Sequence, residues 1–209
     1  MAFYPLLKKY TEEIIPHLPP SCHVTKKSSI AFLVFSIVTL LDIELEEAIL
    51  AVTDGPDDCG IDGIYLKIVQ NKVQVHFFST KFTLPKNTFN GTDIKESLAT
   101  VNKIIEARPL SSQNKALKEK VLEIQDIIHS EEEKIPEYFL HLVSSSEEKS
   151  NIKKYVDPIT EKNININLYG GWDILSLLDK KDKGAEITRS VSIVTEGEVL
   201  NVNESGVSG

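Results

Sequence analysis

The chain has little cysteine and no secretory signal, and each shortage excludes a class of protein. Its 209 residues include 2 cysteines, Cys22 and Cys59, and no C-x-x-C pair of the kind that holds zinc or builds a disulfide framework. The N-terminus lacks the succession of basic region, apolar run and small-residue cleavage site that directs secretion. We therefore expect a protein of the reducing cytoplasm.

The chain also lacks an apolar run long enough for a membrane. The longest such stretch, Ile30 to Leu41, is followed by Asp42 and falls short of the roughly 20 residues that span a bilayer. We expect a buried helix there and no membrane partner. With 41% hydrophobic and 26% charged residues, the composition is that of an ordinary globular protein.

A basic excess is missing as well. The net charge is -8, which counts against a protein that attracts nucleic acid through its overall field. The charges are nevertheless segregated: residues 42–62 are rich in Asp and Glu without any Lys or Arg, whereas residues 81–120 carry eight basic and four acidic residues. This order suits a divalent cation beside a phosphate backbone, and a solvated charged surface would give the same pattern.

Hydrophobic periodicity predicts an α/β chain. The expected helices are 3–18, 30–41, 44–52, 93–107, 113–133 and 172–178, and the expected strands are 61–69, 73–81, 138–144, 163–169 and 185–194. Ser28 or Ser29 would cap the second helix. The tail, 201–209, is small and polar without a closing element, so we expect a longer polypeptide.

The strands 61–69 and 73–81 predict a hairpin that brings two charged residues together. A two-residue turn at Asn71-Lys72 would place Asp62 directly across from Lys81, with Cβ atoms roughly 5 Å apart. Both would share a face with the apolar residues Ile64, Leu66, Ile68, Val73, Val75 and Phe77. An ordinary cross-strand ion pair is the alternative interpretation.

The surroundings of this pair favour a cation site. Asp54, Asp57 and Asp58 lie just before the first strand, and Gly60 lets the backbone turn closely into it. A half-buried group of carboxylates costs free energy unless a cation neutralises it. We expect Asp58 to join Asp62 as a metal ligand.

Two segments of this region carry a family resemblance. Residues 58–65 (DCGIDGIY) and 75–82 (VHFFSTKF) resemble the core of PD-(D/E)XK nucleases of the Mrr-like branch, in which a G-I-D strand precedes a strand ending in Gln-x-Lys. Residues 46–55 (EEAILAVTDG) look like the abortive-infection phage-resistance family, AIPR. The resemblance covers about residues 28–85. It implies a restriction-endonuclease-like mixed sheet flanked by helices, with an N-terminal helix (1–27), a nuclease core (28–135) and further elements (136–209) that complete the core or are appended to it.

The resemblance also assigns roles to single residues. Asp62 would bind the metal ion, the backbone carbonyl of Thr80 would complete its ligands, and Lys81 would orient or activate the attacking water. Glu47, on a helix, would bind the metal or a water beside it. Ser79 stands where the family has Glu or Gln, and its hydroxyl is shorter and uncharged.

These residues lead to a functional expectation. Phosphodiester hydrolysis uses a hard cation, and carboxylate oxygens suit Mg²⁺ or Mn²⁺. We expect a metal-dependent endonuclease domain that acts on nucleic acid, DNA rather than RNA; the resemblance adds a role in bacterial defence against phage. The alternative is a catalytically inactive nuclease fold that binds nucleic acid or forms a homo-oligomer, which Ser79 and the net charge of -8 both favour. A small-molecule-binding domain has no cofactor motif in its support.

Overall fold

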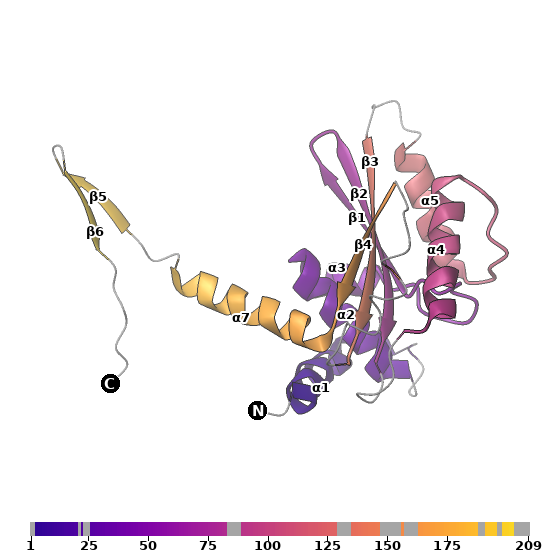
Figure 1. The fold of residues 1–209 in the computed structure, drawn as a ribbon, viewed down its shortest axis with the longest axis horizontal. Coiled ribbons are helices and arrows are strands. Elements are labelled where there is room, and N and C mark those ends of the chain that lie inside the picture. Colours follow the sequence, from indigo (N-terminus) through magenta and orange to yellow (C-terminus); the bar gives the residue numbers. More distant parts are fainter. Residues whose placement is uncertain are drawn as a thin grey trace.

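The chain folds as a mixed sheet with helices on both faces (Figure 1). The computed structural model describes residues 3–20, 22, 26–82, 89–128, 135–146, 156, 163–187, 191–195 and 198–202. The helices are α1 (Phe3–Ile14), α2 (Lys27–Leu41), α3 (Leu45–Leu50), α4 (Gly91–Ile105), α5 (Lys115–Ile128) and α7 (Gly171–Ile187), with a short 3-10 helix at Ile15–His17. The strands are β1 (Gly63–Val69), β2 (Lys72–Lys81), β3 (Ile135–Ser144), β4 (Ile164–Tyr169), β5 (Val191–Thr195) and β6 (Glu198–Val202).

The sheet has four strands in the order β1-β2-β3-β4. β1 runs antiparallel to β2, whereas β2, β3 and β4 are parallel to one another. This confirms the predicted α/β class, a mixed sheet flanked by helices. The strand predicted at 185–194 is only partly right: residues 185–187 belong to α7, and β5 pairs with β6 in a separate two-stranded sheet. Residues 129–133 of the predicted fifth helix and 203–209 of the tail lie outside the described residues.

Two apolar cores follow from the alternation of side chains along the strands. On one face, Val75 and Phe77 pack with buried residues of α4 and α5, such as Val101 and Leu117. On the other face, Phe78 packs against α2. α2 is almost wholly buried, and Figure 1 shows α1, α2 and α3 on the side of the sheet opposite α4 and α5. No helix in the described part of the chain is long and apolar enough to cross a membrane.

The register of the hairpin differs from the prediction by two residues. Ile64 pairs with Phe77, and the turn consists of residues 70–71 instead of 71–72. The predicted direct pairing of Asp62 with Lys81 is therefore wrong. Because side chains alternate with a period of two, a slip of two residues keeps each of them on its predicted face.

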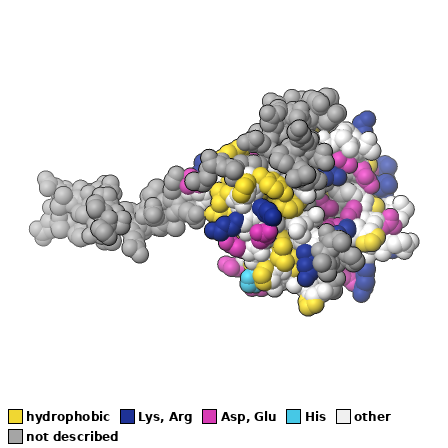
Figure 2. Space-filling view, turned by 90° about the horizontal axis from the view of Figure 1, so that it is seen from below, with side chains coloured by type: hydrophobic (Ala, Val, Ile, Leu, Met, Phe, Trp, Pro, Cys, Tyr) yellow, Lys and Arg dark blue, Asp and Glu magenta, His cyan; other side chains and the backbone are white. Residues whose placement is uncertain are grey.

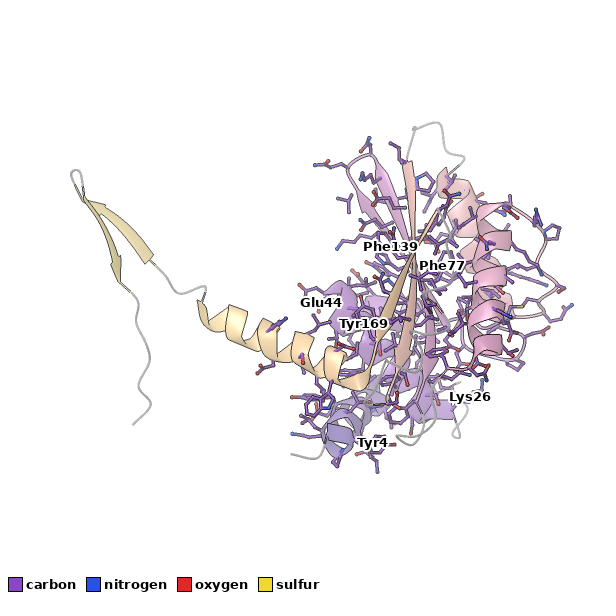
Figure 3. All side chains as sticks on the ribbon, in the orientation of Figure 1. Tyr4, Lys26, Glu44, Phe77, Phe139 and Tyr169 are labelled. Carbon is purple, nitrogen blue, oxygen red and sulfur yellow. The ribbon has the colours of Figure 1, made fainter. Side chains whose placement is uncertain are left out.

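The start of α2 also differs from the prediction. The helix begins at Lys27, and Lys26 occupies the N-cap position without any side-chain hydrogen bond to the first turn. Ser28 and Ser29 thus lie inside the helix instead of capping it. As a result, Lys26 lies at the lower end of the sheet in Figure 3, close to the loop that precedes β1.

Candidate metal centre

A tightly wound loop, residues 54–60, carries the acidic residues to the end of the sheet. Asp57 (φ 66°), Cys59 (φ 55°) and Gly60 (φ 77°) all have a left-handed backbone, which only glycine adopts without strain. A Cβ atom at Gly60 would lie 3.1 Å from the Ser97 hydroxyl oxygen. The close approach of the loop to α4 therefore requires glycine at this position.

Side chains from outside the loop hold this conformation by donating hydrogen bonds to backbone carbonyls. The bonds are Ser97 Oγ to Gly60 (2.9 Å), Thr100 Oγ1 to Cys59 (2.8 Å), Ser112 Oγ to Asp57 (2.5 Å) and Asn114 Nδ2 to Thr53 (2.7 Å). The donors come from α4 and from the segment before α5. The loop is thus tied to the helical layer, and its carboxylates are held in place before any ligand arrives.

The loop and the start of β1 bring three carboxylates together. One oxygen atom from each of Asp54, Asp58 and Asp62 lies within 4.8 Å of the other two. Asp58 is oriented by its own loop, since its carboxylate accepts hydrogen bonds from the backbone N–H of Gly60 (2.9 Å) and of Gly55 (3.4 Å). Carboxylate oxygens at this spacing suit a hard divalent cation such as Mg²⁺ or Mn²⁺.

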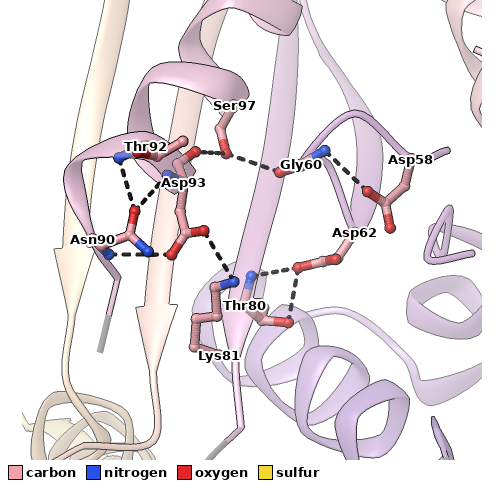
Figure 4. Close-up of polar contacts among 9 residues, drawn as sticks. All are labelled: Asp58, Gly60, Asp62, Thr80, Lys81, Asn90, Thr92, Asp93 and Ser97. Atoms are coloured by element: carbon pink, nitrogen blue, oxygen red, sulfur yellow. Dashed lines mark hydrogen bonds and ion pairs between the residues drawn. The ribbon is translucent and has the colours of Figure 1, made fainter. Parts of the chain in front are cut away.

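Asp62 is buried more deeply than Asp58 and is fixed by the end of β2. Its Oδ2 atom accepts hydrogen bonds from the backbone N–H (2.5 Å) and the hydroxyl (3.1 Å) of Thr80 (Figure 4). Burial raises the pKa of Asp62 to about 7; the hydrogen bonds from Thr80 oppose this shift, and the charges of Asp58 and Asp54 add to it. The group of carboxylates is therefore short of positive charge at neutral pH.

The geometry of Thr80 bears on its predicted role as a carbonyl ligand. The carbonyl of Phe78 accepts the backbone N–H of Asp62 (2.8 Å), so Phe78 turns its polar backbone groups toward β1. Residues two apart on a strand turn these groups to the same edge. The carbonyl of Thr80 thus points to the edge at which the Asp62 carboxylate lies.

Lys26 is a member of the site that the sequence did not indicate. Its Nζ atom lies 2.8 Å from Oδ1 of Asp54. The hydrogen bond with Asp54 raises the pKa of Lys26; burial opposes this, and the negative charges of Asp58 and Asp62 contribute to the increase. The ammonium group is therefore a fixed positive charge beside the three carboxylates.

Lys81 lies in the same cleft but is bound elsewhere. Its Nζ atom is 3.4 Å from Oδ1 of Asp93 and 5.8 Å from the centre of the Phe89 ring. Asp93 is itself held in a capping box at the start of α4, where its carboxylate accepts the backbone N–H of Asn90 (3.1 Å). Among the described residues, no ion pair joins Lys81 to Asp62, so the lysine is held across the cleft from the carboxylates (Figure 4).

A cleft of about 350 Å³ connects these groups. It is lined by Lys26, Ser29, Asp54, Asp58, Gly60, Asp62, Ser79, Thr80, Lys81, Phe82, Asp93, Glu96 and Ser97. The structure thus brings together the predicted residues Asp58, Asp62, Ser79, Thr80 and Lys81, and it adds Asp54, Lys26 and Asp93.

Glu47 is the one predicted site residue that is not brought to this cleft. It lies on α3 with an exposed side chain, and its Oε2 atom accepts a hydrogen bond from the hydroxyl of Tyr65 (2.8 Å). Tyr65 projects from the face of β1 that packs toward α2 and α3. The chain therefore places Glu47 on the far side of the sheet from the three carboxylates.

Comparison of the chain with protein-family models, with curated proteins and with solved structures gave no match. The site therefore has to be interpreted from its own geometry.

Proposed function

We propose that the chain is a divalent-metal-dependent endonuclease domain with a restriction-endonuclease-like fold. The observation that carries the proposal is the convergence of the carboxylates of Asp54, Asp58 and Asp62 within 4.8 Å, in a cleft that also receives Lys81. The cleft lies at the carboxyl ends of the parallel strands, where open α/β sheets bind their ligands.

The donor set fits a hard cation. Asp62 and Asp58 would hold it, with Asp54 and the Thr80 carbonyl as further oxygen ligands; Mg²⁺ keeps several waters and needs few protein ligands. A divalent cation in this place neutralises charge on a phosphate and lowers the pKa of a bound water. Asp62 would be ionised when the cation is bound, because the cation supplies the positive charge that the surroundings of Asp62 lack.

The remaining side chains would position the substrate. Asp93 holds the Lys81 ammonium group (3.4 Å) on the side of the cleft opposite the carboxylates, where it would hold the attacking water or stabilise the charge on the phosphate. Nucleic acid would be bound by side chains of the cleft and not by a large positively charged surface. On the face seen in Figure 2, the described Lys and Arg side chains are interspersed with Asp and Glu.

Two observations favour a second candidate, a catalytically inactive nuclease fold that binds nucleic acid or oligomerises. Ser79, which lines the cleft, offers no charge, and Lys81 is paired with Asp93 instead of pointing at Asp62. The resemblance to the abortive-infection family supplies the expectation of a role in phage defence for either candidate.

A cleavage assay separates the two candidates. Labelled DNA and RNA, single- and double-stranded, are incubated with the protein in Mg²⁺, Mn²⁺ or a chelator. We expect metal-dependent cleavage that Asp62→Ala abolishes, together with metal binding measured by calorimetry. Glu47→Ala, which removes a carboxylate outside the cleft, is the matched control and should keep both. Equal cleavage by the wild type and Asp62→Ala would refute the proposed site, whereas binding without cleavage would favour the inactive module.

A further inference from the structure

Among the described residues, two lysines line the cleft, Lys26 and Lys81, and of these Lys26 is the one that contacts the carboxylate group. Lys81 is held by Asp93, whereas Nζ of Lys26 lies 2.8 Å from Oδ1 of Asp54. The Asp54 side chain is 11% exposed and that of Lys26 is 46% exposed. The ammonium group at the end of a long, half-exposed side chain thus meets a carboxylate that is mostly buried in the cleft wall.

A separate feature indicates that this cleft is shaped for a ligand with polar atoms. Ser79 is only 5% exposed and lines the cleft. Within the part of the chain that the structure describes, no hydrogen bond joins its hydroxyl to another residue. Because Ser79 is otherwise enclosed and lines the cleft, its hydroxyl can hydrogen-bond a metal-bound water or a phosphate oxygen there.

We propose that Lys26 is a resident counter-cation of Asp54, Asp58 and Asp62, and that a divalent cation displaces it from Asp54. The proposal rests on the proposed metal-dependent function and adds an exchange between two cations. An ammonium group and a divalent ion on neighbouring oxygens repel each other strongly. The divalent ion attracts all three carboxylates, whereas the half-exposed ion pair that it breaks contributes little stability.

The displaced ammonium group would then be available to the substrate. Lys26 is the N-cap of α2, its own side chain makes no hydrogen bond to the first turn of that helix, and Ser29 of that turn also lines the cleft. The N-terminus of a helix favours negative charge, and phosphate in particular. Lys26 thus exchanges a carboxylate for a phosphate of the nucleic acid when the metal arrives, so metal and nucleic acid bind with positive coupling.

The first test measures metal affinity without any cleavage. Mn²⁺ is titrated by calorimetry into the wild type, Lys26→Met and Lys27→Met; the methionine keeps most of the side-chain length and removes the charge. We expect Lys26→Met to bind Mn²⁺ about fivefold more tightly, because the competing charge is gone. Lys27→Met is the matched control: this lysine is the next residue but does not line the cleft, so its removal should leave the affinity unchanged.

The outcomes separate this inference from the proposed function. If the wild type binds Mn²⁺ and Lys26→Met binds it equally or more weakly, Lys26 merely supports Asp54, and the exchange is refuted while the metal site stands. If only Lys26→Met binds Mn²⁺, or no variant does, both the exchange and the metal-dependent function are refuted.

The second test addresses the phosphate contact. Binding of fluorescently labelled DNA and RNA is measured by anisotropy in Ca²⁺ and in a chelator, over a range of salt concentrations. In the wild type we expect Ca²⁺ to increase the affinity, and in Lys26→Met to increase it less, with a salt dependence reduced by about one phosphate contact. An equal increase in both proteins would refute the phosphate contact.

Discussion

Two groups of titratable side chains lie on the two sides of the sheet, and burial pushes them toward opposite responses to pH. In the cleft, burial raises the pKa of Asp62 to about 7. On the other side, burial lowers the pKa of His76 to about 4 and that of His141 to about 3, with the charges of Lys67 and His76, respectively, as smaller causes. Burial favours the uncharged form in both places, but only the cleft is open to a ligand.

The histidine pair is enclosed by aromatic rings. His76 Nδ1 and His141 Nε2 are 3.0 Å apart, and the rings stack on Phe139 (4.8 Å between centroids) and Phe78 (4.7 Å). The two other ring nitrogens are buried without a hydrogen-bond partner among the described residues. Figure 3 labels Phe139 and Tyr169 on the strands that carry this stack. Burial thus shifts the pKa of Asp62 and of both histidines. Only Asp62, however, lies in a cleft where it can bind a ligand.

The largest expected effect is on the cleavage rate, and it tests whether catalysis depends on the cleft and not on the histidine pair. Lys81→Ala should leave Mn²⁺ binding intact and slow the single-turnover cleavage rate by about 10²- to 10³-fold, as when one donor to the transition state is removed. The double variant His76→Phe/His141→Phe is the control from the enclosed side, and it should cleave at the wild-type rate. If the histidine double variant cleaved slowly and Lys81→Ala cleaved at the wild-type rate, the reaction would depend on the histidine side of the sheet and the proposed site would be wrong.

The next effect concerns stability at acid pH. A histidine whose pKa is lowered in the folded state contributes stability that is complete above its unfolded pKa, about 6.5, and is lost as the pH falls toward the folded value. Lowering the pH from 7 to 5 should therefore cost on the order of 2 kcal/mol for each histidine. Asp62 acts in the opposite direction: its raised pKa stabilises the fold as the pH falls below about 7.

Urea unfolding in a chelator between pH 7.5 and 5 tests this opposition. We expect the wild type to lose about 1–2 kcal/mol of stability over this range, because the single carboxyl group of Asp62 offsets only part of the loss from the two histidines. In His76→Phe/His141→Phe the fold should become more stable as the pH falls, whereas His17→Gln, which changes an exposed histidine, should behave like the wild type. A double variant that still follows the wild-type curve would show that the histidine pair does not titrate as described.

A smaller effect comes from removing the charge on the cleft side. Asp62→Asn should raise the free energy of unfolding at pH 8 by about 1–2 kcal/mol, because the folded state no longer has to ionise a carboxyl group beside two others. Between pH 7 and 5 the same variant should lose stability, since only the histidine contribution remains. Denaturant curves at both pH values measure this, and lower stability at pH 8 would contradict the assignment of Asp62 as a costly buried charge.

The hairpin illustrates what the sequence could and could not predict. The alternation of apolar residues predicted both strands and the face that Asp62 and Lys81 share. The register could not be predicted from the turn residues, because contacts outside the hairpin override them: the carbonyl of Asn71 accepts the backbone N–H of Ile135 (2.9 Å), and Gly63 bridges to Val52. Gln70 then takes the left-handed φ of 55° for which Asn71 had been the better candidate.

The residues of the site also differ in how far the sequence could predict them. Asp58, Asp62, Ser79 and Lys81 lie close together in the sequence or on paired strands, so local pattern could bring them together. Lys26 meets Asp54 across 28 residues of chain, and its position depends on α2 starting at Lys27 instead of at the serines. The prediction for Glu47 was wrong for the opposite reason. Glu47 is near Asp54 in the sequence, but α3 turns its side chain to Tyr65 and away from the cleft.

The smallest expected effect would sharpen the role of Ser79. Ser79→Glu adds a carboxylate at the buried position beside Asp62, so in a chelator it should destabilise the fold by repulsion, whereas with Mn²⁺ it should bind the ion about fivefold more tightly, a difference of about 1 kcal/mol. Ser79→Gln, with the same length and no charge, is the matched control. Calorimetric titration together with thermal unfolding, with and without Mn²⁺, separates the two effects. If Ser79→Glu bound Mn²⁺ no better than Ser79→Gln did, Ser79 would lie too far from the cation to act as a weakened ligand position, and the metal centre would consist of the three aspartates and the end of β2 alone.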